Sequence, residues 1–167
     1  MVGDEGIAIW CQVTEIRALD LRHCTRITCR SMYHIRQLQH LDTLNLAWVA
    51  NCGADSAPGD RWIRALGPME ELVWLSLFGW QLRDEGALCV AKFFPKLRAL
   101  RCSAAGGGGR AAAGVGAGGG AGGGLTKGGV KKMVKKLPRL GELWLFGGSE
   151  EVRKAVRKDR AWVTVLC

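Results

Sequence analysis

The sequence predicts an α/β fold in which short parallel strands alternate with helices. A strand motif, in which an apolar residue is followed at the third and fifth positions by further apolar residues, occurs five times, as Ile16-Leu19-Leu21, Leu41-Leu44-Leu46, Leu72-Leu75-Leu77, Leu97-Leu100-Cys102 and Leu140-Leu143-Leu145. Between these motifs lie apolar stripes with helical spacing, such as Ala87, Val90, Ala91 and Phe94. Successive strands that are joined by helices run parallel, with right-handed crossovers. One unit cannot bury its leucines alone, so we expect about five units stacked as a short right-handed solenoid.

The spacing of the units divides the chain. The first positions of successive motifs are 25, 31, 25 and 43 residues apart, and most of the last excess is a tract with twelve Gly and seven Ala at 104–124. A stretch so poor in apolar bulk is typical of a disordered loop. We therefore predict repeats over 1–103, the first of them partial, a disordered insertion within the fourth repeat over 104–124, and the remaining repeats with the C-terminal end over 125–167.

Helix boundaries can be read from capping residues. Thr28 and Thr126 are predicted N-caps, because their hydroxyls can accept from free backbone N–H groups. Asp-Glu-Gly occurs at 4–6 and again at 84–86, where acidic side chains suit a helix N-terminus. Pro95 and Pro138 are expected to follow helix ends. Residues 162–166 form a candidate last strand.

The units resemble leucine-rich repeats of the ribonuclease-inhibitor-like, cysteine-containing type, which read L-x-x-L-x-L-x-x-C-x-x-I-T-D-x-G-L. The stretch IRALDLRHCTRIT at 16–28 matches with Cys24 in the cysteine position, and LRDEGALCVAKFFPKLRAL at 82–100 matches the helix half and the next strand. The resemblance implies a horseshoe arc with strands on the concave face and helices on the convex face. It also implies a protein-binding role without catalysis or cofactor.

Alternate strand residues point away from the leucines, so they should line the concave face. Large aromatic side chains are unusual at such positions and are typical of binding surfaces. The predicted partner-binding residues are Asp20, Arg22, Asn45, Trp74, Ser76, Phe78, Arg101, Trp144 and Phe146. Trp48 and Trp80 are expected to flank them on adjoining loops.

A basic run is predicted on one helix face, opposite Val130 and Met133. It consists of Lys127, Lys131, Lys132, Lys135 and Lys136. It is either a solvated helix face or a contact for an acidic protein, phospholipid or nucleic acid. The net charge of +9 allows an acidic partner, but the sequence has no recognisable nucleic-acid motif, and we do not expect a nucleic acid.

Catalysis finds no support in the sequence. His23, His34 and His40 lack metal-ligand spacing, and the seven cysteines include no C-x-x-C pair, so we expect no enzyme activity, metal or cofactor. Reduced, buried thiols indicate an intracellular protein, cytoplasmic or nuclear. No apolar run is long enough for a membrane span, and no signal peptide is expected.

Two more specific roles remain open. Repeats of this type resemble those of F-box proteins, which implies the substrate-recognition part of a ubiquitin ligase, although no F-box is visible in the sequence. The stretches EIRALDLRHC and LQHLDTLNL also resemble the ATP synthase subunit s family, which implies a mitochondrial assembly factor. The identity of the binding partner separates these alternatives.

Overall fold

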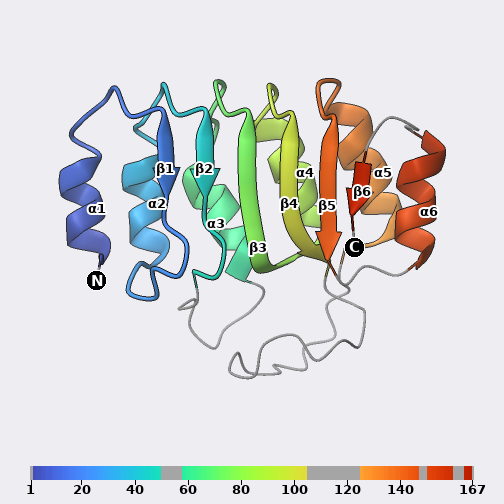
Figure 1. Ribbon diagram of the computed structural model, residues 1–167, viewed down its shortest axis with the longest axis horizontal. Helices are drawn as coiled ribbons and strands as arrows, with labels where there is room; N and C mark the ends of the chain where they lie inside the picture. The colour runs from blue at the N-terminus through green and yellow to red at the C-terminus, as the bar shows by residue number, and fades with distance from the viewer. Residues whose placement is uncertain (1, 50–57, 105–124, 147–149, 160–163, 167) are drawn as a thin grey trace.

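The computed structural model describes residues 2–49, 58–104, 125–146, 150–159 and 164–166, and over these ranges it is an α/β structure with a parallel sheet (Figure 1). The helices are α1 (Asp4–Trp10), α2 (Cys29–Ile35), α3 (Pro58–Leu66), α4 (Asp84–Phe93), α5 (Lys127–Lys136) and α6 (Glu150–Asp159). The strands are β1 (Ala18–Asp20), β2 (Thr43–Asn45), β3 (Trp74–Leu82), β4 (Ala99–Ala104), β5 (Glu142–Phe146) and β6 (Thr164–Leu166). The predicted α/β class and parallel pairing are confirmed.

The strands lie side by side in the order of the sequence, β1-β2-β3-β4-β5-β6. The central leucines of the strand motifs are in register, Leu19 with Leu44, then Leu75, Leu100 and Leu143. Each of them is buried. Helices α2 to α5 lie behind the sheet in Figure 1, and no described helix covers the face turned to the viewer.

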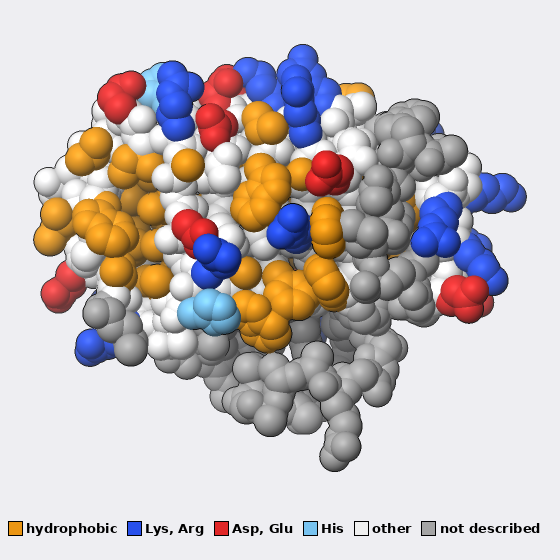
Figure 2. Space-filling model, viewed as in Figure 1, with side chains coloured by type: hydrophobic (Ala, Val, Ile, Leu, Met, Phe, Trp, Pro, Cys, Tyr) orange, Lys and Arg blue, Asp and Glu red, His pale blue; other side chains and the backbone are white. Residues whose placement is uncertain are grey.

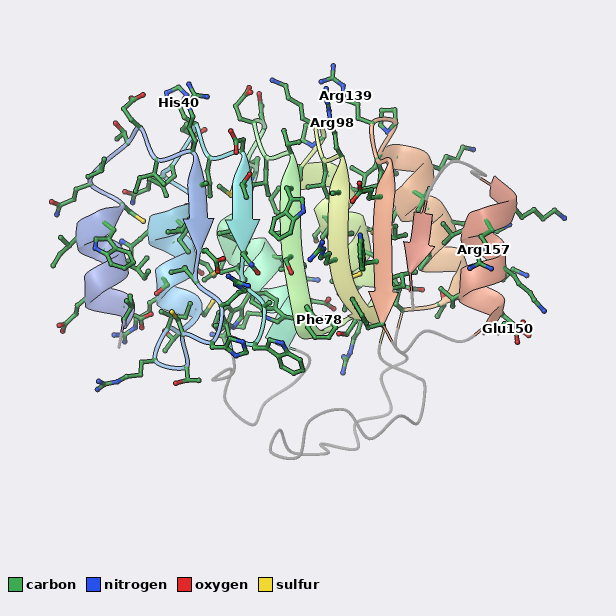
Figure 3. All side chains as sticks on the ribbon, viewed as in Figure 1. His40, Phe78, Arg98, Arg139, Glu150 and Arg157 are labelled. Carbon is green, nitrogen blue, oxygen red and sulfur yellow. The ribbon has the colours of Figure 1, made fainter. Side chains whose placement is uncertain are left out.

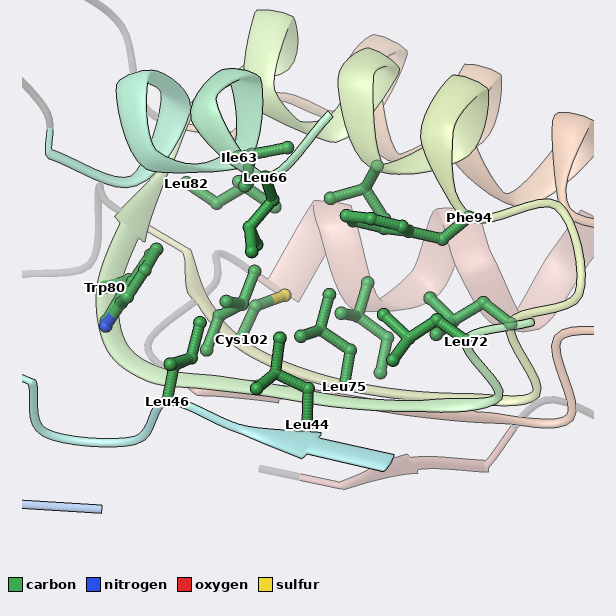
Figure 4. Close-up of a cluster of buried hydrophobic side chains, with 14 of the residues drawn as sticks. Leu44, Leu46, Ile63, Leu66, Leu72, Leu75, Trp80, Leu82, Phe94 and Cys102 are labelled. Atoms are coloured by element: carbon green, nitrogen blue, oxygen red, sulfur yellow. The ribbon is translucent and has the colours of Figure 1, made fainter. Parts of the chain in front are cut away.

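The core is therefore a layer between the sheet and the helices. Figure 4 shows leucines of neighbouring strands meeting Ile63, Leu66 and Phe94 in this layer. Each strand therefore has apolar residues that face the helices, and these alternate with residues that face the side of the sheet without helices.

The predicted helix boundaries agree with the structure. The Thr28 side chain accepts from the backbone N–H of Arg30 at 3.2 Å, and that of Thr126 accepts from Gly129 at 3.1 Å. Helix α4 ends at Phe93 and α5 at Lys136, each two residues before a proline. Of the predicted insertion at 104–124, Ala104 ends β4 and the rest lies outside the described residues.

Aspartates in the first turn of one helix bind the start of the next helix. Asp84 of α4 accepts from the backbone N–H of Thr126 at 2.7 Å and from its hydroxyl at 2.6 Å. Asp4 of α1 makes the same two bonds to Thr28, both at 2.7 Å. We call these contacts aspartate bridges. In both, the donor is the N-cap of the following helix, so each bridge joins neighbouring units on the helix side.

A small residue stands three positions after each bridged N-cap. In α2 it is Ser31, whose hydroxyl also donates to Asp4 at 2.5 Å. In α5 it is Gly129, where an added Cβ would overlap the Asp84 carboxylate. A third aspartate, Asp60 of α3, accepts from the backbone N–H of Arg83, the N-cap of α4, and three positions later stands Gly86, where a Cβ would overlap the Asp60 carboxylate. The glycine of the second Asp-Glu-Gly stretch therefore makes room for the aspartate of the preceding helix.

The pKa values of Asp4 and Asp60 are shifted in opposite directions. Burial raises the pKa of Asp4, but the hydrogen bonds from Ser31 and Thr28 outweigh burial, and the pKa lies below its ordinary value. Among the described residues, Asp60 accepts one backbone hydrogen bond, from Arg83 at 3.3 Å. Burial raises the pKa of Asp60 above its ordinary value, despite that bond and the charges of Arg83 and Arg64.

Alanine at the two adjacent glycines of α5 should have opposite effects on stability. Gly129→Ala drives a methyl group into the Asp84 carboxylate and should lower the free energy of unfolding by about 1–3 kcal/mol. Gly128→Ala meets only the Thr126 hydroxyl, at 3.6 Å, and should raise stability by up to about 1 kcal/mol. Urea denaturation measures both. In an Asp84→Ala background the penalty of Gly129→Ala should largely vanish, and a full penalty there would contradict this explanation.

Asparagine at Asp4 and at Asp60 should change the pH dependence of stability in opposite directions. The lowered pKa of Asp4 means that its contribution is present above the unfolded-state value of about 3.9 and is lost as pH falls through the folded-state pKa. The raised pKa of Asp60 means that its contribution is present at low pH and is lost as pH rises through the folded-state pKa. When the pH falls from about 6 to about 3, the free energy of unfolding of wild type should therefore decrease relative to that of Asp4→Asn. Over the same range, it should increase relative to that of Asp60→Asn. Denaturation at several pH values decides, and parallel curves for both variants would refute this prediction.

Candidate functional site

The helix-free face of the sheet carries a cluster of large side chains. We call it the aromatic face, and it consists of Trp48, Trp74, Phe78, Arg101, Trp144 and Phe146. All six side chains are half-buried. Those on strands alternate with the buried leucines and so point away from the core. Figure 2 shows hydrophobic side chains gathered over the middle strands on this face, with charged side chains among them.

The aromatic rings form a row of contacts from the segment after β2, over β3, to β5. Trp48 meets Phe78 edge-on, with ring centroids 4.8 Å apart, and Phe78 meets Phe146 at 4.2 Å. Phe146 in turn stacks on Trp144 at 6.4 Å. Phe78 and Phe146 belong to β3 and β5, and the β4 residue paired with Phe146 is the small Ser103. The small side chain lets the two rings meet across the intervening strand, near the carboxyl ends of the strands (Figure 3).

Residues with left-handed backbone conformation turn the chain after β1, after β2 and within β3. His23 and Trp48 have φ of 58°, and Gly79 has φ of 90°. Each stands two residues after the last apolar residue of its strand motif. The turn brings the His23 ring parallel to that of Trp48, at 6.4 Å. A Cβ on Gly79 would lie 3.0 Å from Trp48, so glycine serves both the backbone conformation and the close approach of the indole.

Arg101 lies between two indoles at the centre of the face. Its guanidinium carbon is 4.4 Å from the Trp144 ring centroid and 5.3 Å from that of Trp74. The Nε of Arg101 and the Nε1 of Trp144 are buried without a hydrogen-bond partner. Within the described ranges Arg101 forms no ion pair, in contrast to Arg22, which binds Asp20 at 2.9 Å. The face therefore presents a cation that is oriented by aromatic rings and is not neutralised.

A polar margin borders the cluster over β1 and β2. The amide nitrogen of Asn45 donates to the Asp20 carboxylate at 3.4 Å. An open hollow of about 480 Å³ lies here, lined by Ala18, Leu19, Asp20, Thr43, Asn45 and Trp74. Trp74 is shared between the hollow and the aromatic face, so the two form one continuous surface.

Most predicted binding residues lie on this surface, but Ser76 does not contribute to it as expected. Ser76 is only 3% exposed, because it is small and stands in register between Asn45 and Arg101, with Trp74 and Phe78 on either side along its own strand. Asp20 and Arg22 are exposed, and Asn45 is half-buried.

Trp80 is a second correction. It belongs to β3 rather than to a loop, is buried, and meets Trp62 of α3 edge-on at 5.0 Å. Sequence reasoning missed His23 and Gly79 as parts of the aromatic surface. The sequence did hold a signal, because His23, Trp48 and Gly79 each stand two residues after the last apolar residue of a strand motif. A glycine at one of these equivalent positions indicates a left-handed turn at all three.

The predicted basic residues lie on α5, opposite its buried Val130, Met133 and Val134. Lys131 is half-buried, whereas Lys127, Lys132, Lys135 and Lys136 are exposed. These lysines and the aromatic face lie on opposite sides of the sheet, since the helices cover the side that the aromatic face leaves free.

The described cysteines are free thiols. Cys11 and Cys102 are buried, and burial raises the pKa of both, that of Cys102 to about 12. Cys24, which the resemblance places in a structural position, is half-buried with Cys29 and Cys89. Over the described ranges, no set of three or more His, Cys, Asp or Glu side chains is grouped as metal ligands would be, and no helix has the length and apolar character of a membrane span.

Comparison with known proteins does not assign a function to the aromatic face. No protein-family model matches the chain, and no curated protein gives a significant match.

Adjacent residues on the two faces of β4 should respond differently to substitution. Arg101→Met removes a charge whose Nε is buried without a partner, and it should leave the free energy of unfolding unchanged or higher by up to about 1 kcal/mol. Leu100→Ala opens a cavity in the core and should lower it by about 2–5 kcal/mol. Chemical denaturation of the two variants measures the contrast, and a loss for Arg101→Met as large as that for Leu100→Ala would mean that Arg101 serves stability.

Proposed function

We propose that this chain is a non-catalytic protein-binding module of the leucine-rich-repeat type, a short right-handed solenoid that binds a protein partner through its concave strand face. The arrangement of strands and helices supports the repeat assignment. Each strand pairs in register with the strand of the next unit, and helices cover one side of the sheet only. Stacked repeats with one strand and one helix per unit are built in this way.

The aromatic face carries the functional part of the proposal. Its tryptophans, phenylalanines and arginine are the residue types that dominate protein–protein hot spots. They already pack against one another, as the 4.2 Å contact between Phe78 and Phe146 shows. Because neighbouring rings hold these side chains in place, a partner loses little of its binding free energy to ordering them.

The distribution of charge favours a protein over a nucleic acid. Aromatic platforms also bind single-stranded nucleic acids, but they do so in grooves lined with basic residues. Here Arg101 lies among aromatic rings, Asp20 and Glu142 expose carboxylates on the same sheet, and the lysine-rich face belongs to α5 behind the sheet. An extended, mainly apolar surface with a polar margin has the composition of a protein interface.

The proposal is tested by affinity capture from cell lysate with mass spectrometry. The double variant Trp74→Ala/Trp144→Ala should lose partners that wild type retains at moderate salt, because it removes two aromatic anchors. The control Lys132→Ala/Lys135→Ala alters only exposed side chains of α5 and should retain these partners. Circular dichroism establishes that both variants fold. Partners that persist in the tryptophan variant and are lost with salt or in the lysine variant would move the binding surface to α5 and contradict the proposal.

The identity of captured partners also separates the two specific roles predicted from the sequence. Ubiquitin-ligase subunits would support substrate recognition, and subunits of a mitochondrial complex would support an assembly factor.

A further inference from the structure

We propose that Arg101 makes the aromatic face selective for an acidic side chain of the protein partner, an Asp or Glu flanked by apolar residues. This inference rests on the proposed function, since it names the chemistry that the same surface recognises. It depends on three observations: the contacts of Arg101 with two indoles, its lack of a counter-ion among the described residues, and the charges of the neighbouring side chains.

Arg101 is held in place before any partner arrives. Trp74 of β3 and Trp144 of β5 lie within 5.3 and 4.4 Å of its guanidinium carbon. Cation–π attraction to two indoles orients the guanidinium plane and removes much of its contact with water. A planar, oriented guanidinium is suited to the two oxygens of a carboxylate, which it binds through parallel hydrogen bonds.

Arg101 has no counter-ion among the described residues. Arg22, Arg64, Lys96 and Lys154 each form an ion pair with a carboxylate of this chain. Arg101 forms none with any described residue, although Glu142 is exposed on the adjacent strand. An oriented cation in an apolar setting without its own counter-ion is a site for a carboxylate from outside the chain.

Two donor groups at the Arg101 site have no acceptor. The Nε of Arg101 and the Nε1 of Trp144 are both buried and unpartnered, and both can only donate. Burying a donor without an acceptor destabilises the free protein. A ligand that supplies acceptor oxygens would satisfy both donors.

A carboxylate suits this site better than a phosphate. A phosphate dianion is best held by several cations, and the lysine cluster of α5 lies on the other side of the sheet. On the same face, the sheet instead exposes the carboxylate of Glu142 on the strand next to Arg101 and that of Asp20 on β1. One guanidinium can neutralise one carboxylate, whereas the apolar rings would leave the second charge of a phosphate desolvated and unpaired.

The experiment is a selection of peptides from a random phage-displayed library on the intact chain, followed by synthesis of the peptides that the Trp74→Ala/Trp144→Ala variant does not bind. We expect these peptides to contain Asp or Glu beside apolar residues. Replacing that acid by its amide should weaken binding to wild type about 10-fold or more, as for other close charge pairs. With Arg101→Gln the acid and amide peptides should bind equally.

Arg98→Gln is the matched control. Arg98 is exposed at the amino end of β4, three residues before Arg101, and its replacement removes the same charge (Figure 3). It should preserve the preference for acid over amide. If it abolished the preference as Arg101→Gln does, the preference would come from net charge, and the inference would be overturned.

The remaining outcomes are also decisive. Peptides that need the tryptophans but show no acid preference would overturn the carboxylate inference and leave the proposed function intact. A phosphoserine peptide that binds about 10-fold tighter than its Glu counterpart would replace the carboxylate by a phosphate as the ligand. Failure to select any peptide that depends on the two tryptophans would count against both proposals.

Discussion

The structure depends on one constraint, which is that no strand–helix unit can bury its own leucines. A strand of three residues such as β1 or β2 offers one inward side chain, too few for a core. Burial is achieved because Leu44, Leu75 and Leu100 lie in register and are covered by helices of successive units. The apolar area removed from water in this shared layer is the main stabilising contribution. Strand order, parallel direction and the position of the helices all follow from it.

The aspartate bridges fix the position of one helix relative to the next, which apolar packing alone does not. The core would tolerate small shifts of one helix past another, whereas Asp84 and Thr126 meet in one geometry only. The bridge also explains why a first-turn glycine recurs at Gly86 and Gly129. Among the described residues, the bridges run from α1 to α2, from α3 to α4 and from α4 to α5.

The outward residues of the same strands are free of both constraints. Leu100 and Arg101 are neighbours in sequence, yet one is required by the core and the other lies between two indoles on the opposite face. Groups that stability does not require can be kept for recognition. Arg101, with its buried and unpartnered Nε, has the properties of such a group, and the aromatic rings around it provide both the apolar contact area and the rigid setting that a binding site needs.

Local sequence pattern by itself determined the elements of this protein. The period of the leucines predicted the strands, and Thr28, Thr126, Pro95 and Pro138 predicted where helices begin or end, because capping and proline geometry act within a few residues. The alternation of side chains also placed Trp74, Arg101, Trp144 and Phe146 on one face. Tertiary structure alone decided what depends on neighbours from other units. It buried Ser76 among larger side chains, drew Trp80 into the core against Trp62, and set Arg101 between two tryptophans. These outcomes depend on neighbours from other elements, such as Trp62, 18 positions before Trp80, and Trp144, 43 positions after Arg101.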